Sequence, residues 1–271
     1  MTGTLEFYLI NFMPYPYVPP GEEIESSWVV LSNQHYDPRI GHRLYQKYLE
    51  TNVLAERLGF DGVLTNEHHQ TAYGNMPNPN LPAAWVVAQT ERIRIGVMGN
   101  VLNTHQNPLR VAEDIAMLDV MSGGRIISGF VLGTGMEYHS YGINPATSRE
   151  RFWEAHDLII KSWTEPGPFP WESKHFNLPY VNPWPRSLQQ PHPPVWLPGV
   201  SSLETIEAPP ATATPSCRSS RPVPRWPAPA RCTARPPIAT ATPRTPTSWP
   251  RPCSSTSPRP TSRPAWRPSP T

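Results

Sequence analysis

The chain has 271 residues with 23 basic and 21 acidic side chains, and it contains 38 prolines. Residues 1–207 carry 13 basic and all 21 acidic side chains, a net charge of −8, whereas residues 208–271 carry ten arginines and no acidic residue. The second segment also holds 18 of the prolines and all three cysteines, which excludes disulfides, thiolate zinc sites and cysteine nucleophiles from the first. One chain therefore contains two unrelated compositions.

Strands and helices alternate along residues 1–207. Apolar stretches predict strands at Leu5–Phe12, Asp61–Thr65, Ile93–Leu102, Arg125–Gly133 and Val195–Pro198. Helical spacing predicts helices at Arg43–Leu58, at Leu81–Thr90, from Asn107 to Gly123, from a capping box at Thr147–Glu150 to Trp163, and from Ser201 onwards. A stretch rich in proline and tryptophan, Gly167–Pro193, interrupts this rhythm.

This alternation predicts a parallel sheet with right-handed crossovers, in either an open doubly wound sheet or a (β/α)8 barrel. A barrel of this type needs roughly 250 residues, so only about the first five strands fit before residue 208. No run of ~18 apolar residues and no secretory signal occurs, so we expect no membrane span and a cytoplasmic protein.

The segment Ala208–Thr271 has two interpretations. It is a disordered tail whose arginines bind acidic partners, or it is the out-of-frame translation of G+C-rich DNA, which yields Pro, Ala, Arg, Thr and Ser. The boundary falls inside a predicted helix, and Ala211–Thr214 can be encoded by codons that read His-Arg-Tyr in a shifted frame. We therefore favour a frameshift, which resequencing the gene tests.

Four polar residues end the second predicted strand: Asn66, Glu67, His68 and His69. In parallel α/β folds, side chains at the carboxyl ends of strands face the active-site mouth. Two adjacent histidines cannot face the same way along a strand, so at most one of them addresses a substrate directly. A zinc site is not favoured, because catalytic zinc usually takes three protein ligands. The alternative is that backbone partners satisfy both imidazoles.

The third predicted strand ends in Met98, Gly99 and Asn100. The glycine permits the close approach of a flat ring, and the Asn100 amide is suited to hydrogen-bond the edge of such a ring. The alternative is ordinary turn chemistry before the next helix. The stretch Gly133–Tyr138 after the fourth strand is glycine-rich without forming a dinucleotide-binding motif.

Small hydroxyl residues follow the fifth predicted strand at Ser201, Ser202 and Thr205. At a helix N-terminus, such residues offer backbone N–H groups and a positive dipole to a phosphate. An ordinary serine N-cap explains them equally well.

Four segments together resemble the bacterial luciferase-like flavin-dependent monooxygenases: Glu67–His69, Asn107–Arg125, Ser148–Phe169 and Pro193–Glu207. The resemblance spans Leu5–Glu207 in the correct order. It implies a (β/α)8 barrel that binds reduced flavin mononucleotide (FMN) at the carboxyl ends of its strands and uses O2 to oxygenate an organic substrate. It also implies a separate flavin reductase as partner and, for intact relatives, a dimer.

The resemblance carries residue roles. His68 matches the histidine that these enzymes use as a base and to stabilise the oxygen adduct of the flavin. Met98 and Gly99 match the site of a non-proline cis peptide bond beneath the flavin ring. Leu132 stands where many relatives have an arginine on the flavin phosphate. The residues that resemble the phosphate cradle are Ser201, Ser202 and the backbone around Thr205.

We therefore expect a flavin-dependent monooxygenase by ancestry, with no metal, in a truncated copy inactivated by a frameshift. A deazaflavin-dependent oxidoreductase using coenzyme F420 on the same barrel is one alternative, since it transfers hydride without O2. A non-catalytic protein with a basic interaction tail is the other, in which the arginines recognise charge and no specific nucleic acid.

Overall fold

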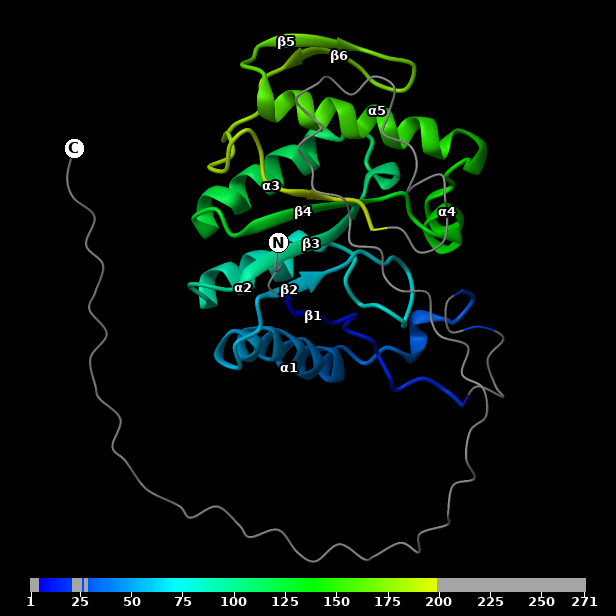
Figure 1. Cartoon of the computed structure of the whole chain (residues 1–271). Helices are drawn as coiled ribbons and strands as arrows, with labels where there is room; N and C mark the ends of the chain where they lie inside the picture. The colour runs from blue at the N-terminus through cyan, green and yellow to red at the C-terminus, as the bar shows by residue number, and fades with distance from the viewer. Residues whose placement is uncertain (1–4, 21–25, 27–28, 199–271) are drawn as a thin grey trace, which may run out of the picture. The chain divides into compact units, whose positions relative to one another are not determined.

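The computed structural model describes residues 5–20, 26 and 29–198 (Figure 1). The predicted phosphate-site residues Ser201, Ser202 and Thr205 lie outside the described residues. The helix predicted from Ser201 and the whole segment 208–271, with its predicted disorder, lie outside them as well.

Five parallel strands form the central sheet in the order β1-β2-β3-β4-β7. Their order in space follows their order along the chain, whereas a doubly wound sheet reverses its order at a switch point. The fold is therefore α/β of the TIM-barrel type, as predicted, and the described part carries five strands of it. These strands are β1 (Tyr8–Ile10), β2 (Gly62–Thr65), β3 (Arg94–Val101), β4 (Ile126–Val131) and β7 (Val195–Trp196).

The longer helices connect the strands and pack against one another in chain order, as the stack of helices in Figure 1 shows, whereas the short helix between the third and fifth lies outside this stack. No helix among the described residues is long and apolar enough to cross a membrane. The helices are α1 (Pro38–Arg57), α2 (Asn80–Gln89), α3 (Leu109–Ser122), α4 (Gly135–Tyr141) and α5 (Pro145–Thr164), with short 3-10 turns η1 (Asn33–His35) and η2 (Leu102–Thr104).

The hydrophobic core lies between the sheet and these helices. Each large apolar side chain buried there stabilises the fold by ~1.5–3 kcal/mol relative to exposure. Trp163 of α5 is buried in this core and donates its indole N–H to the Ala112 carbonyl of α3 at 3.0 Å, which fixes the two helices together. The fully buried members include Val63, Ile95, Val97, Ile126, Val86, Ile115 and Ile159.

Two helices begin earlier than the sequence pattern indicates. α1 begins at Pro38, where the Asp37 carboxylate accepts the Arg39 N–H at 2.7 Å. α5 begins at Pro145. In both helices a proline in the first turn presets a helical backbone, although no apolar periodicity marks that turn.

The capping box predicted at Thr147–Glu150 is wrong. Asn144 is the N-cap of α5, and its side chain accepts the Ala146 N–H at 3.0 Å. A capping box occurs instead at Thr134–Glu137, where it starts α4 in the glycine-rich stretch after the fourth strand, for which no helix was predicted.

The proline-rich stretch contains an antiparallel hairpin of β5 (Phe169–Glu172) and β6 (Asn177–Val181). The hairpin packs on α5 through two cation–π contacts. The Lys161 ammonium lies 4.8 Å from the Phe169 ring centre, and the Arg151 guanidinium lies 4.4 Å from the Phe176 ring centre. Contacts with α5 therefore hold a segment that shows no strand pattern of its own.

Candidate active site

The two adjacent histidines after β2 face different partners. His68 Nδ1 lies 3.3 Å from Glu137 Oε1. His69 Nε2 lies 2.6 Å from Glu67 Oε1, and His69 Nδ1 lies 3.0 Å from the Tyr141 hydroxyl. The side chain of His68 is 17 % exposed and that of His69 is 8 % exposed. Side chains, rather than the backbone partners considered above, hold both rings, and His68 is the more accessible.

Glu67 ties the end of β2 to the end of β3. Its buried carboxylate accepts the Val101 N–H at 2.9 Å and lies 3.1 Å from the Thr104 hydroxyl, in addition to its contact with His69. Since a carboxylate only accepts hydrogen bonds, His69 donates from Nε2 and accepts the Tyr141 hydroxyl at Nδ1. This network therefore gives His69 a structural part.

The His68 ring is held between aromatic side chains. The Phe12 ring stacks on it at a centroid distance of 5.8 Å, and the Tyr73 ring meets it edge-on at 5.3 Å. A Cβ at Gly74 would lie 3.0 Å from the imidazole Cδ2, so a larger residue there would require the His68 ring to shift. These contacts limit the movement of the ring, which favours directed proton transfer.

Glu137 contacts His68 and was not among the residues that the sequence pattern singled out. Its carboxylate is 1 % exposed and accepts the Thr134 N–H at 2.8 Å and the Thr134 hydroxyl at 2.7 Å. Burial opposes its charge, but the hydrogen bonds from His68 and Thr134 outweigh that effect and lower the pKa of Glu137 to about 2. An ionised carboxylate only accepts, so the contact with Glu137 favours a proton on His68 Nδ1.

The peptide bond between Met98 and Gly99 is cis, the geometry that the resemblance implies there. A Cβ at Gly99 would lie 2.6 Å from the Gly129 carbonyl oxygen, and a Cβ at Gly129 would meet the Val97 oxygen. The glycine is therefore required by the backbone of the neighbouring strand β4. This requirement was not foreseen, since the sequence analysis connected Gly99 with the approach of a ring.

Asn100 is 1 % exposed, and its side chain contacts α2. Asn80 of α2 donates its amide to Asn100 Oδ1 at 3.2 Å and lies at the same distance from an Asp114 carboxylate oxygen of α3. The predicted contact of Asn100 with a ring edge thus has a competing partner within the described residues.

Two other asparagines offer unused acceptors at the strand ends. Asn66 follows β2 and donates to the Asn11 carbonyl, while Asn103 follows β3 and donates to the Leu132 carbonyl, both at 3.1 Å. The Oδ1 atoms of Asn66 and Asn103 are buried and have no hydrogen-bond partner among the described residues. Buried acceptors of this kind suit a bound molecule or water that donates hydrogen bonds.

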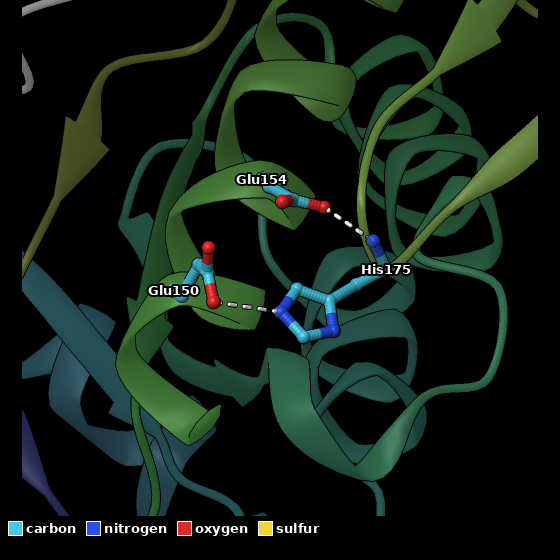
Figure 2. A group of neighbouring side chains, drawn as sticks. All are labelled: Glu150, Glu154 and His175. Carbon is cyan, nitrogen blue, oxygen red and sulfur yellow. Dashed lines mark hydrogen bonds and ion pairs between the residues drawn. The ribbon is translucent and has the colours of Figure 1, made fainter. Parts of the chain in front are cut away.

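A possible metal-ligand group, Glu150, Glu154 and His175, lies away from these residues, between α5 and the hairpin (Figure 2). The Lys174 ammonium already lies 2.8 Å from Glu150, and hydrogen bonds from Lys174 and His175 lower the pKa of Glu150. Glu154 accepts the backbone N–H of His175 at 2.8 Å. Because Lys174 already supplies the positive charge, these residues connect α5 with the hairpin through hydrogen bonds and an ion pair.

An apolar groove of about 270 Å³ lies between α1, α2 and the loop before α2. None of the predicted site residues lines it. Its walls include Tyr45, Leu49, Leu81, Pro82 and Trp85.

A family model described as luciferase-like monooxygenase matches residues 25–208. The oxygenase component of a flavin-dependent trigonelline monooxygenase from Acinetobacter baylyi is 29 % identical over 164 residues, which is 59 % of this chain and 45 % of the relative. The alkanal monooxygenase alpha chain of Photobacterium leiognathi is 28 % identical over 185 residues, 68 % of this chain and 47 % of the relative. The chain thus spans about half the length of these curated relatives.

Solved structures give the same picture. Monooxygenase RslO1 from Streptomyces bottropensis has a TM-score of 0.56 and 30 % identity, covering 71 % of this chain and 53 % of its own. The FMN-bound oxygenating constituent of 3,6-diketocamphane monooxygenase from Pseudomonas putida has a TM-score of 0.54 and 23 % identity. The match covers 72 % of this chain and 51 % of that one. An F420-dependent secondary alcohol dehydrogenase has a TM-score of 0.51 and 22 % identity, and the match covers 57 % of this chain and 48 % of that one. The last two likenesses concern the fold.

Proposed function

Because the chain belongs to the luciferase-like monooxygenase family, we propose that it derives from an oxygenase that uses reduced FMN and O2 to oxygenate an organic substrate. The observation that carries this proposal is the pairing of His68 with the ionised Glu137 at the carboxyl ends of the strands. An imidazole with a protonated Nδ1 and an acceptor Nε2 is suited to take up and return a proton near neutral pH.

The described residues fit the ring end of a flavin. Their contribution is two buried acceptors, the Oδ1 atoms of Asn66 and Asn103, which follow the neighbouring strands β2 and β3 and have no hydrogen-bond partner among the described residues. Flavin supplies the redox chemistry when bound, while the chain orients it, excludes water and moves a proton at His68 Nε2. The phosphate would be held by three residues outside the described part: Ser201, Ser202 and Thr205.

The reduced flavin comes from a separate reductase in this proposal, because one relative is named as the oxygenase component of its enzyme. The organic substrate is not specified by the described residues. A dimeric assembly and a cytoplasmic location stay predictions.

An F420-dependent oxidoreductase is the second candidate, since a solved structure with that cofactor shares the fold. In that case His68 would face a hydride-transfer reaction, and O2 would not be consumed. The non-catalytic alternative with a basic tail concerns residues outside the described part and stays a prediction.

The test compares His68→Ala with His139→Ala, an exposed histidine on α4, in a chain whose reading frame after Glu207 has been restored. We expect His68→Ala to lower oxygenation by about 100-fold or more while the FMN dissociation constant changes less than about threefold. His139→Ala is expected to change neither. Parallel losses of oxygenation and FMN binding in His68→Ala would contradict the assigned role, and turnover with F420 without O2 would favour the second candidate.

A further inference from the structure

The contact between α4 and the loop after β2 pairs two consecutive histidines with two residues one helical turn apart. Glu137 contacts His68, and Tyr141 contacts His69. Residues at i and i+4 lie on one face of a helix, so a single face of α4 covers both rings. The rings contact carboxylates through opposite nitrogens, since Nδ1 of His68 faces Glu137 and Nε2 of His69 faces Glu67.

We propose that Glu137 is a positioning residue for His68, which holds the imidazole as the Nδ1–H tautomer and so makes Nε2 the atom that exchanges a proton. The inference rests on the proposed function, in which His68 is the proton-transferring group. Neutral imidazole in water favours a proton on Nε2, so the opposite tautomer needs an acceptor fixed at Nδ1. Among the described residues, Glu137 is that acceptor.

Burial and local bonding make Glu137 suited to this part. Its carboxylate is 1 % exposed, and Thr134 occupies one oxygen through two hydrogen bonds, which leaves the other oxygen to His68 at 3.3 Å. The capping box therefore fixes the acceptor before the imidazole meets it. The aromatic contacts from Phe12 and Tyr73 set the plane of the ring, but they do not choose its tautomer.

A purely structural alternative is that Glu137 serves only as the cap of α4. The two parts use different oxygens of one carboxylate, Oε2 for the cap and Oε1 for His68. Thr134→Val removes the hydroxyl contact to Oε2 and leaves the His68 contact, so it is a matched control for capping alone. Glu137→Gln keeps the size of the side chain. Because the Thr134 N–H needs the amide oxygen at the position of Oε2, the amide NH2 group is left to face Nδ1 as a donor.

The experiment is nitrogen-15 NMR of the full 271-residue chain labelled at histidine, at about pH 8 where imidazoles are neutral. The His68 signals are assigned by their loss in His68→Gln. We expect about nine tenths of the Nδ1–H form in the unsubstituted chain and in Thr134→Val, and less than about one half in Glu137→Gln. Predominance of the Nε2–H form in the unsubstituted chain would overturn the proposal, as would an unchanged tautomer in Glu137→Gln.

The spectrum of the unsubstituted chain is sufficient to determine the tautomer of His68. The proposal is therefore tested even if a variant fails to fold. The measurement also needs no flavin. FMN titration of the chain whose reading frame after Glu207 has been restored tests the cofactor separately, and we expect Glu137→Gln in that chain to change the dissociation constant less than about threefold. The expected tautomer without FMN binding by the restored chain would overturn the proposed cofactor and support the positioning contact, whereas FMN binding with the other tautomer would overturn the positioning part alone.

Discussion

The buried Glu137 carboxylate makes the stability of the folded chain depend on pH. Burial opposes its charge, but hydrogen bonds from His68 and Thr134 lower its pKa from the ordinary 4.5 to about 2. Because the folded pKa is the lower one, this contribution is fully present above about pH 4.5 and is lost as the pH falls toward 2. The shift corresponds to stabilisation on the order of 3 kcal/mol, since each pKa unit is ~1.4 kcal/mol.

We therefore expect the free energy of unfolding of the unsubstituted chain to exceed that of Glu137→Gln most at pH 6, and the excess to shrink steadily between pH 4.5 and 2. Urea unfolding followed by circular dichroism at several pH values measures this difference. Glu172→Gln, at an exposed position, is the control and should leave the stability nearly unchanged across the same range. A difference for Glu137→Gln that does not vary with pH would contradict the buried ionised state.

At the scale of residues, the place after a predicted strand singled out His68 and His69 together, and the family resemblance chose His68. Sequence reasoning missed Glu137, because the pairing joins residues 69 positions apart and nothing local in the sequence marks such a contact. The Thr134 to Glu137 spacing is the signal that was available, since it has the form of a capping box. The same pattern at Thr147–Glu150 was misleading, because Asn144 and Pro145 offer an earlier start.

Arg125 links several secondary structure elements at the start of β4. Its guanidinium N–H groups donate to the Ser122 carbonyl at 2.9 Å, to the Ile93 carbonyl at 3.0 Å and to three acceptors near the end of α2. Burial lowers the pKa of Arg125. The acceptors at the C-terminal ends of α2 and α3 offset this effect, because the helix dipole favours a cation there. The acceptors near α2 are Val87 O, Thr90 O and Thr90 Oγ1.

Arg125→Lys is expected to lower the free energy of unfolding by about 2 kcal/mol, because an ammonium cannot reach acceptors that a planar fork satisfies and leaves buried carbonyls unpaired. Urea unfolding measures the change. The control is Arg110→Lys, whose side chain is 71 % exposed and forms a single i,i+4 ion pair, so its substitution should change stability by less than about 0.5 kcal/mol. Equal effects of the two substitutions would show that the Arg125 bonds contribute little.

Among the elements, the long apolar strands and periodic helices were predictable, and the short polar elements were not. β3 and α3 bury most of their residues, so hydrophobic pattern determines them. α4 has seven residues and depends on its cap. The β5–β6 hairpin contains proline and alternates weakly, so contacts with α5 determine it instead of local pattern.

The sheet curves as part of a barrel, and its outermost strands contact each other over the inner face. The Tyr8 ring of β1 meets the Trp196 ring of β7 edge-on at 5.3 Å, and Gly62 of β2 leaves room for the Tyr8 side chain. Burial raises the pKa of Tyr8 to about 12, which keeps it neutral. β1 and β7 each pair with one neighbour within the described residues, so one edge of each strand presents backbone groups for further strands.

The open edges and the composition change after Glu207 lead to a prediction about the whole molecule. If residues 208–271 are an out-of-frame translation, restoring the frame from Ala208 onwards should supply strands that pair with β1 and β7, together with a continued phosphate site. We expect FMN to bind the restored chain at least about tenfold more tightly than the 271-residue chain, because two or more phosphate hydrogen bonds contribute ~1 kcal/mol each. Fluorescence quenching of FMN measures both constants at equal protein concentration, and light scattering reports aggregation through exposed edges. Equal affinities would mean that five strands suffice for binding and that the frameshift hypothesis explains nothing about cofactor recognition.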